Sequence, residues 1–260
     1  MLYFKALYKE RTYFFNSVFL IFALLVLILL IFDLEFSGSR TTDTLAPVWL
    51  FITAGGGIYG IAVFLLLLSA FVLYNFKFSK SKRRVAYLFL YTVFCVQLIN
   101  TSVTYFVLKD SILKPRPSQL YITGGEFKDP AGVLYIDRLP EERKKYLRDM
   151  SENNPDKFKE IYPPLLYNWI NETENSFPSG HSQSSFFLAV IFAFIISSTV
   201  SIKNKYLTVI PLLWSLLVSL SRVVIGVHYN TDVIAGASMG IITALAIISI
   251  KKFNVLFQRY

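Results

Sequence analysis

Three short stretches of this chain carry side chains that can hold an anion and transfer a proton. They are residues 109–117, 177–182 and 221–232. Their cationic and titratable members are Lys109, Arg116, His181, Arg222, His228 and Asp232. Arginine and lysine neutralise oxyanions, and a histidine held by a carboxylate is an oriented nucleophile or base. Taken singly, each stretch also fits a structural role, so its meaning depends on where the chain places it.

The middle stretch, Phe177-Pro178-Ser179-Gly180-His181-Ser182, has the composition of a helix entry. Proline has no N–H to donate and suits the first turn of a helix, while Ser179 and Gly180 offer a hydroxyl and unobstructed backbone N–H groups. Such a helix start favours an anion, and His181 adds a titratable donor. An ordinary helix cap is the alternative, because proline, serine and glycine are common at these positions.

The elements that must position these stretches are membrane-spanning helices. Of the 260 residues, 54% are hydrophobic and 17% are aromatic, which excludes an ordinary soluble domain. No Gly/Ser-rich or Pro-rich linker divides the chain, so residues 1–260 are expected to form a single domain. Cys95 is the only cysteine, which excludes an intrachain disulfide and a cysteine metal cluster.

Six apolar segments are long enough to cross a bilayer, so the predicted fold is an all-α, polytopic six-transmembrane-helix bundle. The spans are expected at about 14–32, 47–74, 85–108, 183–202, 206–225 and 233–250. A signal peptide is disfavoured for the first span, because the span is long and no small-residue cleavage site follows it. In the second span, the spacing of Gly56 and Gly60 indicates close packing with another helix, and an interrupted transporter helix is the alternative.

The charges that flank the spans indicate their orientation. The N-terminal segment, the second and fourth connections and the C-terminal segment together hold half of the 26 lysine and arginine residues. The first connection instead contains one basic residue, Arg40, and three acidic residues, namely Asp33, Glu35 and Asp43. By the positive-inside rule, both termini are expected to be cytoplasmic. This topology also explains the net charge of +9, which needs no nucleic-acid partner.

In this topology the three stretches meet at the outer membrane boundary. Lys109 and Arg116 follow the third span, His181 begins the fourth, Arg222 ends the fifth, and His228 and Asp232 precede the sixth. Ionisable groups at the edge of the hydrocarbon are costly and usually functional. Three cations, two imidazoles and a helix N-terminus at one depth predict a pocket for a highly charged anion, with phosphate as the first candidate.

Each group also has a structural alternative. Lys109 and Arg116 can anchor a helix at the interface, and Arg222 can pair with lipid headgroups. His228 and Asp232 can form only a surface hydrogen bond at a helix start. Metal binding by the two histidines is disfavoured, because the nearby cations repel a metal ion and no His-Glu-x-x-His pattern is present.

Together, Lys109-x6-Arg116-Pro117, Pro178-Ser179-Gly180-His181 and Ser221-Arg222-x5-His228-x3-Asp232 resemble the three-part signature of the type 2 phosphatidic acid phosphatase superfamily in order and spacing. The resemblance implies a phosphatase that uses no metal or other cofactor and forms a phosphohistidine intermediate. It implies that His228 is the nucleophile, that Asp232 orients it, and that His181 is the general acid for the leaving group. It also implies that the phosphoryl group is bound by Lys109, Arg116, Ser179, Gly180 and Arg222.

A polar insertion of about 60 residues, 118–177, separates the first two motifs. Its length and position resemble the bacterial phosphatidylglycerophosphatase B branch of the superfamily, which also acts on undecaprenyl pyrophosphate. Residues 140–150 and 155–161 are predicted to form short helices, and residues 165–170, with Tyr167 and Trp169, an interfacial segment. The insertion is interpreted as a lid or lateral gate over the lipid headgroup, with a solvated spacer as the alternative.

These expectations describe an integral membrane lipid phosphatase of the bacterial cytoplasmic (inner) membrane, with its active site on the extracytoplasmic face. Its expected substrate is a membrane lipid phosphate or pyrophosphate, namely phosphatidylglycerophosphate and/or undecaprenyl pyrophosphate. A lipid A phosphatase is the alternative within the enzyme class. A lipid-phosphate binding or transport protein on the same scaffold is the non-enzymatic alternative, and it is disfavoured because His181, His228 and Asp232 are all present.

Overall fold

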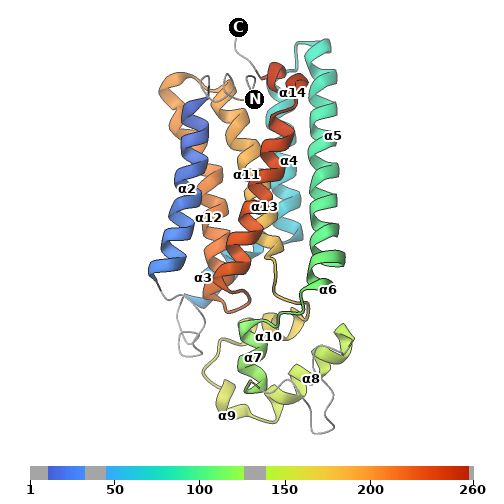
Figure 1. Ribbon diagram of the computed structural model, residues 1–260, viewed down its shortest axis with the longest axis vertical. Coiled ribbons are helices and arrows are strands. Elements are labelled where there is room, and N and C mark those ends of the chain that lie inside the picture. Colours follow the sequence, from blue (N-terminus) through green and yellow to red (C-terminus); the bar gives the residue numbers. More distant parts are fainter. Residues whose placement is uncertain (1–10, 33–44, 126–138, 258–260) are drawn as a thin grey trace.

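The computed structural model describes residues 11–32, 45–125 and 139–257, and the regular structure in these ranges is helical (Figure 1). Six of the described helices are long and apolar enough to cross a membrane, as the sequence predicts. Several residues used in the sequence argument lie outside the described ranges: Lys5, Lys9, Asp33, Glu35, Arg40, Asp43, Arg259 and residues 126–138 of the insertion.

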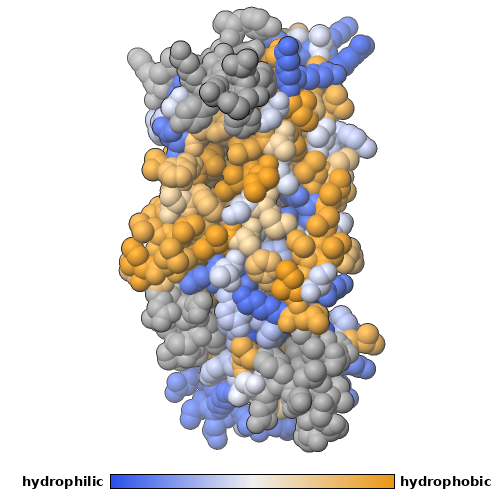
Figure 2. All heavy atoms as spheres, viewed as in Figure 1, coloured by the Kyte–Doolittle hydropathy of each residue, from blue (hydrophilic) through white to orange (hydrophobic). Residues whose placement is uncertain are grey.

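The spans form one bundle around a central helix. They are α2 (Thr12–Ile31), α4 (Ile58–Asn75), α5 (Lys80–Val103), α11 (Gly180–Thr199), α12 (Val209–Val224) and α13 (Asn230–Ile248). The 3-10 helix η3 (Ile202–Thr208) leads into α12, and α14 (Lys251–Leu256) follows α13. Because α11 packs against all five other spans, it is apolar on every side, and residues 186–191 are fully buried. On the face seen in Figure 2, apolar residues form a band across the middle of the molecule, with hydrophilic residues beyond it towards each end.

The second span differs from the continuous helix expected at 47–74. It consists of α3 (Ala46–Ala54) and α4, which are separated at Gly55-Gly56-Gly57. A Cβ on Gly56 would lie 2.4 Å from Cγ1 of Val218 on α12 and 3.1 Å from the ring of His181. Gly56 therefore serves the close helix packing that the sequence predicts. A Cβ on Gly60 would instead lie 2.2 Å from the carbonyl oxygen of Gly55, so Gly60 serves the break in the helix beside His181 and not the contact between helices.

Buried polar side chains fix the rotation of α5 within the bundle. Gln97 donates a hydrogen bond to the hydroxyl of Ser184 on α11 at 2.7 Å, and Asn100 donates one to Thr243 on α13 at 3.1 Å. One turn further along, the hydroxyl of Thr104 bonds to Gln183 on α11. Such contacts between apolar helices specify their register, so α5 delivers the residues that follow it to a defined place.

Two glycines on α13 bring this helix against the start of α11. A Cβ on Gly236 would lie 2.3 Å from the carbonyl oxygen of Ser179, and a Cβ on Gly240 would lie 2.3 Å from that of Gln183. Any side chain at these positions would meet backbone, which cannot move aside as a flexible side chain does. The approach joins the second and third sequence motifs.

The insertion forms a helical layer at one end of the bundle, opposite α14 (Figure 1). Its helices are α7 (Pro117–Thr123), α8 (Pro140–Glu152), α9 (Pro155–Phe158) and α10 (Pro163–Asn171). Trp169 is fully buried and its indole N–H donates to the carbonyl of Ile225, between α12 and α13, at 2.6 Å. The prediction of an interfacial segment at 165–170 is therefore wrong for Trp169, which packs inside the protein, whereas Tyr167 is exposed.

Candidate active site

Lys109 and Arg116 are delivered to the site by the end of the third span. The π-helical turn η1 (Thr104–Leu108) widens the helix before α6 (Lys109–Ser111), and the Lys109 ammonium lies 4.6 Å from the centre of the Tyr105 ring. Arg116 then caps α7, where its backbone N–H donates to the side chain of Gln119 at 3.0 Å. Both of these basic side chains are buried.

The second motif forms the first turn of α11. The hydroxyl of Ser179 caps the helix by accepting hydrogen bonds from the backbone N–H and the hydroxyl of Ser182, at 3.4 and 3.1 Å. The Ser179 N–H donates to the backbone carbonyl of Asp232 at 3.0 Å. The starts of α11 and α13 are thus bonded to each other, and partly exposed His181 faces the break between α3 and α4.

The third motif is the tight connection between α12 and α13. Arg222 lies in the last turn of α12, and its carbonyl accepts the N–H groups of Val227 and His228, both at 3.1 Å. Gly226 has a φ of 76°, which lets the chain reverse within this short connection. Asp232 lies in the first turn of α13 and is fully buried, with its Oδ2 atom 3.6 Å from Nδ1 of His228.

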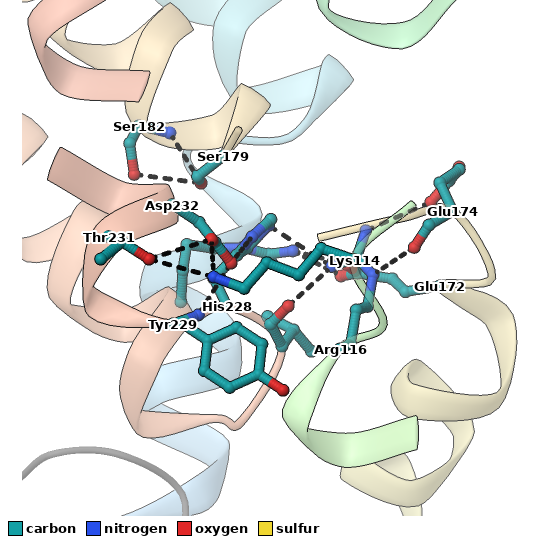
Figure 3. A network of polar contacts seen from close by, with 12 residues as sticks. Lys114, Arg116, Glu172, Glu174, Ser179, Ser182, His228, Tyr229, Thr231 and Asp232 are labelled. Atoms are coloured by element: carbon teal, nitrogen blue, oxygen red, sulfur yellow. Dashed lines mark hydrogen bonds and ion pairs between the residues drawn. The ribbon is translucent and has the colours of Figure 1, made fainter. Parts of the chain in front are cut away.

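Arg116 joins the insertion to the nucleophile candidate. Its guanidinium donates to the carbonyl oxygens of Glu174 and Val227 at 2.9 and 3.1 Å, and its Nη1 atom lies 3.4 Å from Nε2 of His228 (Figure 3). Its Nη2 atom also pairs with the Glu174 carboxylate at 3.3 Å. The Nε2 edge of the His228 ring therefore faces a guanidinium. A guanidinium in this position can hold the oxygens of a phosphoryl group in front of an attacking nitrogen.

Glu172 occupies the centre of this cationic pocket. Both of its carboxylate oxygens accept from Nη2 of Arg222, at 2.8 and 2.6 Å, and Oε2 lies 2.5 Å from Nη1 of Arg116. Arg222 also donates a 2.8 Å hydrogen bond from Nη1 to the hydroxyl of Thr53 on α3. The two arginines are therefore already bridged by an oxyanion. In the described chain this oxyanion is the Glu172 carboxylate, which belongs to the insertion.

The clustering of cations sets the charge states of the site. Burial lowers the pKa of His228 well below its ordinary value, and Arg116, Arg222 and Lys109 lower it further, so the imidazole is neutral at neutral pH. Burial alone would raise the pKa of the Glu172 carboxyl, but Arg222 and Arg116 outweigh burial and hold that pKa well below its ordinary value. Glu172 is therefore an anion, and His228 is an electron-pair donor.

All the predicted site residues lie at the end of the bundle that carries the insertion. Arg116, Arg222 and His228 meet around Glu172, and Lys109 and His181 interact electrostatically with the same group. Gly180 packs against the ring of Tyr105, near Lys109. Asp232 stands behind His228, on the side away from Arg116.

Four residues of the site have no counterpart in the sequence argument: Thr53, Lys114, Glu172 and Glu174. Thr53 belongs to a span, and Glu172 and Glu174 belong to a polar insertion with many charges, so no spacing marks them. Lys114 lies between Lys109 and Arg116, and its Nζ atom is 2.7 Å from Oδ1 of Asp232. For Glu172, the usable signal was physical: two buried arginines require a counter-anion.

Known proteins share the segments that build this site. The profile of the PAP2 superfamily matches residues 90–256, which include all the predicted site residues. Phosphatidylglycerophosphatase B of Haemophilus influenzae is 27% identical over 218 residues, covering 82% of this chain and 86% of that protein. Phosphatidylglycerophosphatase B of Bacillus subtilis is 30% identical over 94 residues, covering 35% and 45%. Probable lipid phosphate phosphatase 4 of Arabidopsis thaliana is 29% identical over 151 residues, covering 55% and 42%.

Proposed function

We propose that this chain, which belongs to the PAP2 superfamily and is a lipid phosphatase, removes the terminal phosphate of a lipid phosphate or pyrophosphate through a phosphohistidine on His228. The names of the two bacterial relatives favour phosphatidylglycerophosphate as a substrate. Undecaprenyl pyrophosphate is proposed as a second substrate, because it presents the same terminal phosphoryl oxygens to the same cations.

One observation carries this proposal: Nε2 of His228 faces Arg116, which together with Arg222 already holds an oxyanion. Nε2 of this histidine is directed towards Arg116 at 3.4 Å, and its Nδ1 atom towards Asp232 at 3.6 Å. A phosphoryl group that replaces the Glu172 carboxylate would place its phosphorus within reach of Nε2. Preplaced cations then stabilise the charge that develops on the equatorial oxygens.

The proposed reaction has two steps. In the first, Nε2 of His228 forms a bond to phosphorus, the bond to the leaving oxygen breaks, and His181 gives that oxygen a proton. In the second, water attacks phosphorus while His181 takes a proton from it, and the P–N bond breaks to release phosphate and restore His228. Lys109, Arg116, Arg222, Ser179 and the Gly180 N–H hold the phosphoryl oxygens, and Asp232 stabilises the imidazole as it becomes cationic.

We further propose that residues 1–260 are one lipid phosphatase domain in the bacterial inner membrane, with both termini cytoplasmic and the site on the extracytoplasmic face. The basic residues at the start of α5 and in α14 lie at the end opposite the site, as the positive-inside rule requires for this orientation. A phosphatase reporter fused after Arg138 should be active outside the cell and one fused after Lys82 silent; the reverse pattern would place the site in the cytoplasm.

The insertion is proposed to act as a lid. α10 ends at Asn171, so Glu172 is fixed to this layer, and an outward movement of α10 would withdraw its carboxylate from Arg116 and Arg222. The same outward movement of α10 would then admit the lipid headgroup and remove the Glu172 carboxylate from the phosphate-binding arginines.

Single-turnover kinetics with two substrate types test the roles of the histidines. His228→Ala should form no phosphoenzyme with any substrate. His181→Ala should lose more activity on a lipid monophosphate, whose alkoxide leaving group needs a proton, than on a lipid pyrophosphate, whose phosphate leaving group needs it less. Asp232→Asn should be milder than His228→Ala. An active, folded His228→Ala protein would remove the mechanism, and equal losses for His181→Ala on both substrates would remove its role as the acid.

A further inference from the structure

Lys114 occupies an unspecified position of the first motif, between Lys109 and Arg116, yet it contacts the carboxylate that faces the proposed nucleophile. It sits in the extended segment between α6 and α7, and its ammonium donates to Oδ1 of Asp232 at 2.7 Å and to the hydroxyl of Thr231 at 3.0 Å (Figure 3). The ammonium also lies 4.1 Å from the centre of the Tyr229 ring. The side chain of Lys114 is 32% exposed, whereas that of Asp232 is fully buried.

The two oxygens of Asp232 therefore have different partners. Oδ1 accepts from Lys114, while Oδ2 accepts the backbone N–H of Tyr229 at 2.9 Å and faces Nδ1 of His228 at 3.6 Å. That last distance exceeds a hydrogen bond, and Nδ1 of His228 has no hydrogen-bond partner among the described residues. The carboxylate is thus held close behind the ring by Lys114 and Tyr229, without being bonded to it.

A carboxylate beside an imidazole has two opposing effects on a nucleophilic histidine. It stabilises the cationic ring that forms during phosphoryl transfer, but it also favours protonation of the ring before the reaction, which removes the nucleophile. A cation on the far oxygen of the carboxylate weakens the second effect, because it offsets the negative charge that the resting ring experiences.

We propose that Lys114 is a positioning residue that fixes Asp232 behind His228 and offsets its charge, so that the ring remains an unprotonated nucleophile in the resting enzyme. This inference rests on the proposed role of His228. The other charged groups around the ring are Arg116 at the start of α7, Arg222 on α12, Lys109 on α6 and Glu172 after α10. Lys114 acts on the opposite edge of the ring from Arg116, through the Asp232 carboxylate.

The pH dependence of kcat/KM for p-nitrophenyl phosphate tests the proposal. The leaving group of this substrate needs little protonation. The fall of kcat/KM at low pH, the acidic limb of the profile, therefore reports protonation of His228 rather than of His181. Titration of the substrate itself is the same for every variant and cancels in the comparison. Lys114→Met should move the acidic limb upward by about one pH unit, so that activity on that limb falls about tenfold and alkaline activity changes little. Lys114→Arg should restore the wild-type profile.

Lys157→Met is the matched control. Lys157 also packs on aromatic rings and donates to a carbonyl, that of Tyr121 at 2.6 Å, but it belongs to α9 and makes no contact with Asp232. Its profile should match that of the wild type. If Lys114→Met folds poorly, Lys114→Cys in a Cys95→Ser background gives a second route, since a thiol reagent carrying an ammonium group restores the charge and a neutral reagent of the same size does not.

An unmoved acidic limb in Lys114→Met with a uniform loss at all pH values overturns the proposal, as does equal recovery with the charged and neutral thiol reagents. A His228→Ala arm separates this failure from failure of the proposed function. If His228→Ala keeps its activity, the nucleophile itself is misassigned. If it is inactive while Lys114→Met leaves the limb in place, only the role of Lys114 is refuted.

Discussion

Replacing Glu172 with glutamine should make the enzyme bind phosphate-like anions more tightly. The Glu172 carboxylate bridges Arg116 and Arg222 in the place proposed for the phosphoryl group. A ligand must displace this internal anion, so its apparent affinity is lowered by the fraction of molecules in which the carboxylate holds the pocket. Glutamine keeps the size and one acceptor oxygen of the side chain but removes the charge that competes.

The size of the effect follows from the contacts that are exchanged. Glu172 makes three short contacts with two buried guanidinium groups, and its side chain is 18% exposed. Hydrogen bonds to charged groups contribute about 1.5–3 kcal/mol each, but the bound anion re-forms most of them, so we assign about 2 kcal/mol to the competition. This corresponds to about 30-fold tighter binding in Glu172→Gln.

Vanadate is a suitable probe, because it resembles the pentacoordinate transition state and needs no lipid. The inhibition constant would be measured for the wild type, Glu172→Gln and Glu174→Gln. Glu174 is the matched control: within the described ranges its carboxylate pairs only with Arg116, at 3.3 Å, and its side chain is 45% exposed. Its replacement should change the constant by less than about threefold, as expected for an exposed ion pair.

The same substitution should destabilise the protein without ligand. Loss of the shared anion leaves two buried guanidinium groups poorly compensated, which should lower the melting temperature, and excess vanadate should restore it. Weaker vanadate binding by folded Glu172→Gln would refute the reasoning, because Glu172 would then assist anion binding instead of competing with it. Equal changes in Glu172→Gln and Glu174→Gln would show a general loss of negative charge rather than a bridging carboxylate.

Three further outcomes are expected. In the proposed mechanism His228 reacts in its neutral form, and its pKa is lowered, so the loss of kcat/KM at low pH should occur below pH 6.5; a loss that begins above pH 7 in wild-type profiles would contradict this. Phosphate release should survive chelators, and activity lost in EDTA and restored by a divalent metal would refute a reaction based on Lys109, Arg116 and Arg222 alone. Gly236→Ala should abolish activity because its Cβ would lie 2.3 Å from the Ser179 carbonyl, whereas Ser238→Ala, on the same helix, should remain active in the same assay.

The six spans were predictable because each is a long apolar segment. A bilayer requires about 20 apolar residues in a row, and few other structures contain apolar segments of that length. The break between α3 and α4 could not be predicted, because the three glycines at 55–57 do not make the segment less apolar. The interruption depends on the close approach of Val218 and His181, which is a tertiary contact. Trp169 illustrates the same limit. A tryptophan beside a membrane suits an interface or a protein core equally well, and the hydrogen bond to Ile225 that decides between them is a tertiary contact.

The convergence of the three motifs followed from the parity of the spans, which places the relevant helix ends on one side. The ion-pair partners did not follow from it. Glu172 and Lys114 are ordinary charged residues of polar connections, and their spacing to Arg222 and Asp232 carries no periodic signal. Only the requirement that buried charges be compensated points to them, and that requirement does not say which loop supplies the partner.

This requirement also links the insertion to the chemistry. Arg116 and Arg222 are buried in the structure without substrate, and a bound substrate would cover them further, so we expect an anion to accompany them in both states. Without substrate that anion is Glu172. In the proposed mechanism the phosphoryl group takes its place, and the two anions cannot both lie between the arginines without placing like charges in contact. On this proposal, substrate entry requires the Glu172 carboxylate to leave the arginines, and product release allows it to return. Because Glu172 follows α10 directly, each turnover is expected to move the end of α10 towards solvent and back.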